Sequence, residues 1–451
     1  MSANTRPAVH SQKDANIMKN IIRWLNNDIG KAFGSGAIHV LTGTFVNKFV
    51  SMFSSIVIIR LLTPTEYGIL SYYENLFSYF IVFSGLGLAN AILRYVVIGE
   101  TAEIKYGCYQ YSRTRGVLYN IIMASIGVLI AMVYPHSNAF ADYWWLLILL
   151  VLVLPFNYMY TCGLYTERAM MDAKKYAYSS LTISLVIIIA KLIGAGTFGL
   201  VGTISFRLTA EIIMAIFMSA LVYHMYFKGV SHSKPTRAER KTINVYALQY
   251  MITNGLWYLF MLNDTFLLGR LCNDATVLAI YKVAYILPAS LLLFSTSMGI
   301  YVGPYFTKNE KKGNIAWVKQ NWLKKSVINF CLVGVASLVI FVFARPLVLF
   351  IYGEQYLSAV GLMRILVFAA VINAGLRHLT AHILASMGQI KYNMIVSAVG
   401  MAFQIVLNIV IIPRYGSIGV AWVSVVIYSA MAIAINAVFI KKYFRSNYEC
   451  H

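Results

Sequence analysis

The chain is a succession of apolar segments, each about as long as a membrane-spanning helix. A helix needs about 20 mostly apolar residues to cross a bilayer, and the 451-residue sequence contains twelve such segments. They are 38–60, 69–92, 116–134, 144–166, 176–197, 199–227, 242–268, 275–303, 326–350, 358–385, 390–412 and 416–440. Only 12% of the residues are charged, about half the share in soluble proteins. The sequence therefore predicts an all-α polytopic membrane protein with about twelve transmembrane helices.

The basic residues are distributed unevenly between the loops that join these segments. Cytoplasmic loops of membrane proteins carry an excess of Lys and Arg. With a cytoplasmic N-terminus, the loops and tails on that side hold 27 Lys and Arg residues, and the opposite loops hold only Arg270 and Arg414. This pattern predicts that both termini are cytoplasmic. It also accounts for the net charge of +21, so we expect no nucleic acid as a partner.

Two short patterns occur twice in the chain. FGLVG at 198–202 and YGSIG at 415–419 each open an apolar segment, and they are 217 residues apart. MMDAKKY, ending at Tyr176, and MGQIKY, ending at Tyr392, are related by an offset of 216. Internal repeats are common in membrane transporters. Together these patterns predict two six-helix bundles related by a pseudo-twofold axis along the membrane normal.

The boundaries follow from these segments. The N-terminal bundle is predicted at 37–227 and the C-terminal bundle at 242–440, with a basic cytoplasmic linker at 228–241 and a cytoplasmic tail at 441–451. In the N-terminal cytoplasmic tail, 1–36, several apolar residues share one helical face beside basic residues. This is typical of an amphipathic helix on a membrane surface, and an irregular tail is the alternative. The five cysteines are scattered, which predicts neither a disulfide framework nor a metal site.

Eight cations but only three acids lie inside or at the ends of the apolar segments. The cations are Lys48, Arg60, Lys191, Arg207, Lys282, Arg345, Arg364 and Arg377, and the acids are Glu74, Glu211 and Asp264. A lipid-facing charge at mid-bilayer costs at least ~2.5 kcal/mol, so several of these should face a polar cavity or a partner. We expect Arg60 and Arg345 to reach the headgroups from helix ends. Arg377 fits either interpretation.

Four motifs, in order, carry a resemblance to a known family. They are RLLTPTEYGILSYY at 60–73, IYGEQYLSAVGLMRIL at 351–366, ASMGQIKYNM at 385–394 and IPRYGSIGVAW at 412–422. In combination they resemble bacterial oligosaccharide-repeat-unit flippases, the O-antigen and capsule translocases of the multidrug/oligosaccharidyl-lipid/polysaccharide exporter superfamily. The resemblance covers nearly the whole chain. Within the first motif, Pro64 and Gly68 are expected to shape a tight periplasmic turn.

The resemblance implies a secondary transporter of the bacterial inner membrane. Its two bundles would alternate between inward-open and outward-open states. The substrate would be a polyprenyl-pyrophosphate-linked oligosaccharide, flipped from the cytoplasmic to the periplasmic leaflet during biosynthesis of lipopolysaccharide O-antigen or capsule. Membrane lipid, and a polysaccharide polymerase with a chain-length regulator, are the further partners that it suggests.

The charges in the spans suit such a substrate. Cations would replace the lost hydration of a diphosphate, and arginine adds bidentate hydrogen bonds to phosphate. Depth estimated from a rise of ~1.5 Å per residue selects Lys48, Arg207, Lys282 and Arg364 as candidate headgroup contacts. Structural ion pairing or snorkelling is the alternative for each of them.

Three acids are candidates for coupling transport to H⁺ or Na⁺, because buried carboxylates can carry either ion. These are Glu74, Glu211 and Asp264. Glu211 can instead neutralise Arg207, and Asp264 can be merely interfacial. We interpret the i, i+4 pair of His378 and His382 as polar lining rather than as a metal site.

Other classes of protein fit the sequence less well. The absence of a GxxxxGK[ST] motif argues against ATP-driven transport by this chain alone, and no cofactor is expected. A multidrug exporter of the same superfamily would favour an acidic cavity for cationic drugs. A membrane glycan polymerase or ligase typically has a large periplasmic loop, whereas these loops are predicted to be short, so we do not expect an enzyme. A passive scaffold would make the intramembrane cations dispensable.

Overall fold

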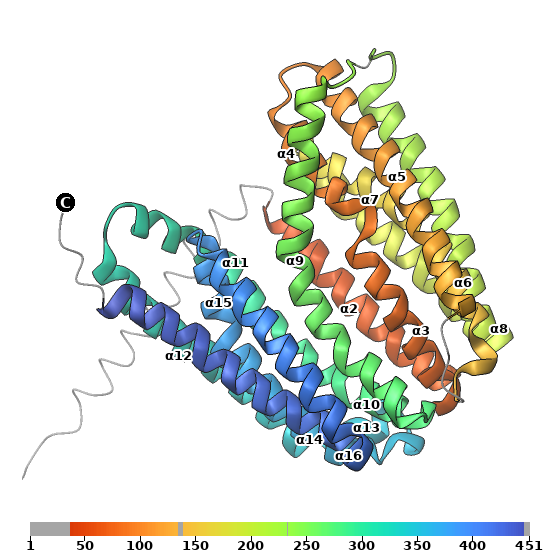
Figure 1. Cartoon of the computed structure of the whole chain (residues 1–451), viewed down its shortest axis with the longest axis vertical. Helices are drawn as coiled ribbons and strands as arrows, with labels where there is room; N and C mark the ends of the chain where they lie inside the picture. The colour runs from red at the N-terminus through yellow and green to blue at the C-terminus, as the bar shows by residue number, and fades with distance from the viewer. Residues whose placement is uncertain (1–36, 134–138, 232, 446–451) are drawn as a thin grey trace, which may run out of the picture.

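The computed structural model describes residues 37–133, 139–231 and 233–445, and every regular element within them is helical. The amphipathic helix predicted for 1–36 lies outside the described residues. The α-helices (Figure 1) are α2 (Ala37–Leu61), α3 (Pro64–Val82), α4 (Leu88–Ile98), α5 (Ala102–Val133), α6 (Trp145–Val151), α7 (Leu154–Ala169), α8 (Ala173–Val222), α9 (Arg237–Cys272), α10 (Ala275–Ser290), α11 (Leu292–Lys311), α12 (Ile315–Val342), α13 (Ala344–Ile351), α14 (Ala359–Ala370), α15 (Leu379–Ser386) and α16 (Ile390–Ile440). The short 3₁₀ or π-helical turns are η1 (Ser84–Gly87), η2 (Ala141–Tyr143), η3 (Tyr223–Phe227), η4 (Glu354–Tyr356), η5 (Val371–His378) and η6 (Lys441–Arg445).

The two longest helices, α8 and α16, each reverse direction at a glycine. Gly199 has φ 59° and ψ −135°, and Gly416 has φ 53° and ψ −137°. Residues other than glycine rarely adopt this backbone conformation. A Cβ added at Gly202 would lie 2.2 Å from the carbonyl oxygen of Gly194. Residues eight apart in a straight helix are separated by about 12 Å. The two arms of α8 therefore fold back on each other as a hairpin of two spans, as FGLVG predicted.

Counting the hairpins in this way recovers the predicted number of spans. Eight helical segments of the described chain are long and apolar enough to cross a membrane, and Ala173–Phe227 and Ile390–Phe444 are the two that hold the hairpins. Helices α2 and α9 supply the spans predicted at 38–60 and 242–268. The fold is an all-α polytopic membrane protein with twelve spans in two bundles.

The two halves share local backbone detail at one spacing. The reversals at Gly199 and Gly416 are 217 residues apart, and so are Met171 and Gly388, which both have positive φ. Helices α8 and α16 begin two residues after this second pair. The offset of 216 predicted from MMDAKKY and MGQIKY is therefore wrong by one residue. The structurally equivalent positions are those that adopt the left-handed turn, not the two methionines that look alike in sequence.

The turn after the first span differs from its prediction. Thr63 caps α3 through a capping box: the Glu66 carboxylate accepts a hydrogen bond from the Thr63 N–H at 3.0 Å, and Thr63 Oγ1 accepts one from the Glu66 N–H at 3.3 Å. This arrangement satisfies free N–H groups at a helix start, and Pro64 is the first helical residue. Gly68, predicted to shape the turn, lies inside α3 instead. A Cβ there would lie 1.9 Å from the carbonyl oxygen of Ala275, so Gly68 permits α3 to pack closely on α10.

Several other predicted spans are divided into separate helices, among them the second and the ninth. The second span begins at Pro64 and is interrupted at η1, where Gly85, Leu86 and Gly87 all have positive φ, before α4 continues it. The ninth span ends at Val342, and the rest of the predicted segment forms the separate helix α13.

The helices form a V with two arms (Figure 1). Helices α4 to α8 lie in one arm and α10 to α16 in the other. Helix α9 packs against α3 and α4 on one side and against α16 on the other. The arms meet where α3 packs on α10, and they diverge toward the α4–α5 loop, the start of α9 and the α11–α12 loop. These are the loops predicted to be cytoplasmic, so the V opens toward the predicted cytoplasmic side.

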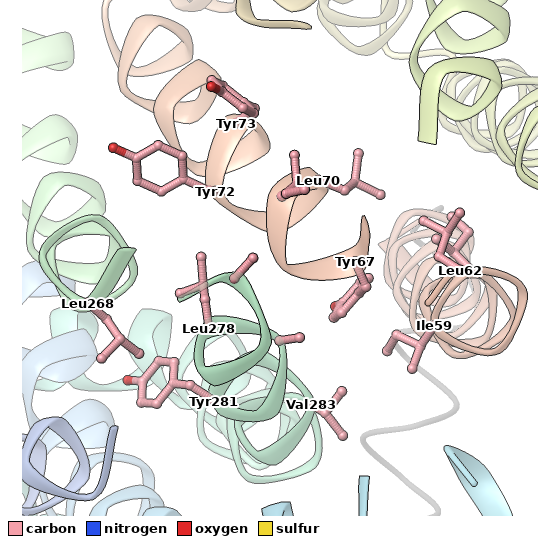
Figure 2. Close-up of a cluster of buried hydrophobic side chains, with 14 of the residues drawn as sticks. Ile59, Leu62, Tyr67, Leu70, Tyr72, Tyr73, Leu268, Leu278, Tyr281 and Val283 are labelled. Carbon is pink, nitrogen blue, oxygen red and sulfur yellow. The ribbon is translucent and has the colours of Figure 1, made fainter. Parts of the chain in front are cut away.

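A buried cluster holds the other end of the V closed. It contains side chains from α2, α3, α9 and α10 (Figure 2), which include Ile59, Tyr67, Leu268 and Leu278. Because these helices come from both halves, their packing joins the two arms. The cluster is the main contact that would have to separate if the V opened in the opposite direction.

Arg60 adds a polar contact near this end. Its guanidinium donates hydrogen bonds to the backbone carbonyls of Phe350 and, at 2.8 Å, of Ile351. These carbonyls belong to the last turn of α13, where carbonyls lack helical partners. Arg60 therefore links α2 in the first half to α13 in the second, and its contact with the headgroups stays a prediction.

Candidate functional site

Four charged side chains of the first half form one ion-pair network. Glu74 Oε1 on α3 lies 2.8 Å from Lys191 Nζ and 3.2 Å from Arg207 Nη1. Arg207 Nε donates to Glu211 Oε1 at 2.9 Å. Arg207 and Glu211 are four residues apart on the second arm of α8, so they share a helix face, as the sequence predicted. Two cations and two carboxylates balance, and the network is neutral.

Polar neighbours complete this network. Glu211 is only 1% exposed, and its Oε2 accepts hydrogen bonds from Asn157 Nδ2 at 3.2 Å and Tyr160 Oη at 3.3 Å. The Arg207 guanidinium lies 5.0 Å from the ring centroid of Phe77. Removing one member of a buried pair leaves an uncompensated charge, which is costly. In this state Arg207 therefore takes part in structural ion pairs with Glu74 and Glu211. Its contact with a headgroup stays a prediction.

Asp264 on α9 is the central acceptor of a second cluster, in the other half. Its Oδ1 accepts hydrogen bonds from Gln404 Nε2 at 2.9 Å and Asn408 Nδ2 at 2.7 Å. Its Oδ2 accepts from the hydroxyls of Ser424 at 3.0 Å and Tyr281 at 3.3 Å. Asp264 is 7% exposed. The interpretation of Asp264 as merely interfacial is therefore wrong.

Two amide oxygens of this second cluster accept no hydrogen bond from the described residues. Gln404 Oε1 and Asn408 Oδ1 are buried and have no hydrogen-bond partner among the described residues. Carboxylate, amide and hydroxyl oxygens are the ligands of hard cations, and protonation would equally remove the buried charge of Asp264. The arrangement can therefore hold a proton or a small cation. No group of three or more His, Cys, Asp and Glu side chains occurs as a metal site in the described chain.

Lys282 connects the two clusters. It is half-buried on α10, and it interacts electrostatically with both Glu74 and Asp264. The sequence-predicted residues Arg207, Lys282, Glu74, Glu211 and Asp264 are thus brought together around the contact between α3, α8, α9 and α10.

The other two predicted contacts lie elsewhere. Arg364 on α14 is exposed, donates to the backbone carbonyl of Phe341 at 3.4 Å and lies 5.4 Å from the centroid of that ring. Lys48 is exposed on α2 and interacts electrostatically with His378 of the other half. The structure does not bring Arg364 together with the other predicted cations, and its role stays a prediction.

Sequence reasoning did not select Arg377, which the structure places in an unusual setting. It is 4% exposed, lies in the π-helical turn η5 and stacks on Trp257 of α9, with 4.2 Å between the guanidinium carbon and the ring centroid. The available signal was an arginine beside His378 in a span that contains no acid. The stacking partner lies 120 residues away in the chain, so no local pattern could identify it.

Comparisons with known proteins agree on the class of this fold. Residues 33–310 match the model of the polysaccharide biosynthesis protein family. An uncharacterized membrane protein of Haemophilus influenzae is 21% identical over 305 residues, which cover 66% of this chain and 70% of that protein.

Two solved structures are similar over most of their length. An inward-facing multidrug resistance MATE family transporter of the MOP superfamily superposes with a TM-score of 0.71 at 16% identity, covering 91% of this chain and 99% of that one. The lipid II flippase MurJ, in an inward closed conformation, gives a TM-score of 0.70 at 13% identity, covering 89% and 87%. At such identities the likeness shows the fold alone. The family model matches more than half of the sequence, and the chain therefore belongs to the polysaccharide biosynthesis protein family.

Proposed function

We propose that this protein is a secondary transporter that flips polyprenyl-pyrophosphate-linked oligosaccharide repeat units from the cytoplasmic to the periplasmic leaflet of a bacterial inner membrane. The family match supports a role in polysaccharide biosynthesis. The observation that carries the proposal is the excess of cations over acids in the spans, with Lys48 and Arg377 contributed by different halves of a V that opens toward the predicted cytoplasmic side. Such an excess favours an anionic headgroup over a cationic drug.

The proposed transport mechanism uses the open end and the closed end of the V in turn. In this state the lipid-linked diphosphate enters from the open end and meets cations of both arms. Closure around the headgroup, followed by separation of α3 from α10, would expose it to the other side. Arg207 and Lys282 lie nearer the closed end of the V. They would contact the diphosphate next, after Arg207 exchanges its carboxylate partners for phosphate oxygens. Arg364 would have to leave Phe341 to join them.

Asp264 is the coupling residue in this proposal. Its four donors come from α10 and from both arms of α16, so binding of H⁺ or Na⁺ would change the contacts of α9 with three other spans at once. Glu74 and Glu211 are already paired with cations. They are therefore less available to bind an ion while the V is open on this side.

Ion-coupled multidrug export is the competing function, because the MATE transporter superposes as well as MurJ does. Proteoliposomes containing the full-length protein and a fluorescent undecaprenyl-diphosphate-linked oligosaccharide distinguish the two. We expect the glycan to become accessible to an added lectin faster than in protein-free vesicles. Export of ethidium without movement of the glycan would establish the competing function and reject ours.

Complementation provides the cellular test. The gene should restore surface polysaccharide in a strain that lacks its own O-antigen or capsule flippase. A polymerase or ligase would instead lengthen or transfer purified lipid-linked units in vitro, which our proposal excludes. The polymerase and the chain-length regulator of the host would act on the flipped product.

A further inference from the structure

Arg377 is a buried cation without a counter-ion among the described residues. The four ion pairs of the described residues do not include it. Its Nη1 donates to Asn373 Oδ1 at 3.1 Å, whereas its Nε is buried and has no hydrogen-bond partner among the described residues. Burying a charge without a partner is strongly unfavourable. The buried charge of Arg377 lies in a π-helical turn. Such a local distortion frequently occurs at functional sites.

Trp257 fixes the orientation of the guanidinium. The ring of Trp257 covers one face of Arg377, with 4.2 Å between the guanidinium carbon and the ring centroid, and stacks on Phe260 with 5.2 Å between centroids. Stacking on an aromatic ring occupies the face of a guanidinium and leaves its in-plane N–H donors free. An anion can therefore bind at the edge of Arg377 without displacing Trp257.

Two histidines lie on the same span as Arg377. The rings of His378 and His382 are 4.7 Å apart and meet edge to face, and His378 Nε2 lies 3.1 Å from Thr296 Oγ1. Both histidines are half-buried. A Cβ at Gly299 would lie 2.8 Å from His382, so Gly299 of α11 makes room for this ring. The histidines thus form a half-exposed pair, here named the rim, on the same span as the buried arginine.

The cations that act electrostatically on His378 are Arg377 and Lys48. His378 interacts electrostatically with Arg377, His382 and Lys48, and Lys48 comes from α2 in the other half. Imidazole N–H groups and guanidinium N–H groups both donate to phosphate oxygens. The combination selects an anion that has several acceptor oxygens.

We propose that Arg377, with Trp257, His378 and His382, forms a binding site for the diphosphate of the lipid-linked substrate, and that Lys48 completes it from the other half. The inference rests on the proposed function and assigns the headgroup contact to residues of span ten. Arg377 supplies the free N–H at the base of the site, and the histidines supply donors at its rim. A ligand shared by Lys48 and span ten would draw the two arms together at their open end.

The test measures binding of radiolabelled farnesyl diphosphate to the full-length protein in lipid nanodiscs. We expect Arg377→Gln to weaken binding about 10- to 100-fold, the loss of one or two charge-assisted hydrogen bonds, and Arg377→Lys to weaken it less. Because a buried variant can misfold, His382→Gln at the half-exposed rim is the second variant, and it should also weaken binding. Arg94→Gln is the matched control, because Arg94 also stacks on an aromatic ring of α9, Tyr246, at 4.8 Å, but is exposed.

Competition identifies the group that is recognised. Inorganic pyrophosphate should displace the probe, and phosphatidylglycerol should not. Displacement by phosphatidylglycerol alone would assign the site to bilayer headgroups, and displacement by neither would assign recognition to the prenyl chain; both results overturn the inference. Unchanged binding by folded Arg377→Gln and His382→Gln would also overturn it. If the wild-type protein neither binds the probe nor flips the glycan, the proposed function itself has failed.

Discussion

Two buried groups of opposite charge lie in the second half, and neither forms an ion pair within the part of the chain that the structure describes. Asp264 is held by Ser424 and three other neutral donors, and Arg377 is held by Asn373. Tyr428 interacts electrostatically with both charges. Ser424, Asn373 and Tyr428 line a cavity of ≈ 20 Å³. This volume holds about one water molecule. Electrostatic effects act over longer distances in a low-dielectric interior than in water, so an ion bound at Asp264 can influence the environment of Arg377.

Asp264→Asn tests the coupling role at this scale. The substitution preserves shape and removes the negative charge, so the ion should lose its main ligand while the fold is kept. We expect stimulation of flipping by a proton or sodium gradient to fall by about 5- to 150-fold, the range typical of coupling between two sites. Flipping in proteoliposomes with imposed gradients provides the measurement. Asp142→Asn, an exposed acid, is the matched control, and an unaltered gradient response in Asp264→Asn would reject the assignment.

At the scale of elements, the hairpins α8 and α16 depend on single glycines. Gly199 and Gly416 adopt nearly the same φ and ψ values, so each half contains one backbone reversal of the same shape. The second arm of each hairpin carries part of a polar cluster: Arg207 and Glu211 in α8, and Ser424 in α16. A change at the reversal would therefore move functional side chains together with the helix.

Gly416→Ala is expected to destabilise the protein through backbone strain alone. Only the Cys272 Sγ lies within 4 Å of an added Cβ, at 3.8 Å, so steric crowding is not the cause. A residue other than glycine in such a conformation costs about 1–3 kcal/mol. Thermal unfolding in detergent provides the measurement. Gly334→Ala in α12, where nothing lies within 4 Å of an added Cβ, should be neutral or stabilising; equal melting temperatures for the two variants would contradict the argument.

At the scale of the whole molecule, transport requires the closed end of the V to open. That end is held by close packing at Gly68, by the buried cluster of α2, α3, α9 and α10, and by Arg60 on α13. Packed interfaces of this kind tend to adopt discrete alternative arrangements rather than continuous deformations. The proposed cycle therefore alternates between closure at α3 and α10 and closure at the opposite end.

A cross-link between α3 and α10 tests this cycle. The hydroxyls of Thr65 and Thr276 are 3.4 Å apart, so cysteines at the two positions are close enough to form a disulfide. In a background that carries Cys272→Ser, oxidation of the double variant Thr65→Cys/Thr276→Cys should stop flipping, and a reductant should restore it. Each single cysteine variant should be insensitive to oxidant. Full flipping by the cross-linked protein would show that α3 and α10 need not separate.

The membrane fold could be deduced from the chain itself because its signals are local. Apolar length, the placement of basic loops and the glycine patterns of the two halves predicted twelve spans in two bundles, and the pairing of Arg207 with Glu211 followed from helix periodicity. The errors were also local: Gly68 looked like a turn residue, and one repeat was aligned by similar letters instead of equivalent backbone positions.

Tertiary structure decided which polar residues meet. Asp264 is bonded by Gln404 and Ser424, which are more than 100 residues away, and the stacking of Arg377 on Trp257 joins two distant spans. No periodicity encodes such pairings, because they depend on how whole helices rotate and cross when their apolar faces pack. The sequence by itself therefore determined that cations lie within the membrane, whereas only the packing of the helices decided that, among the described residues, Arg207 is paired with acids and Arg377 is not.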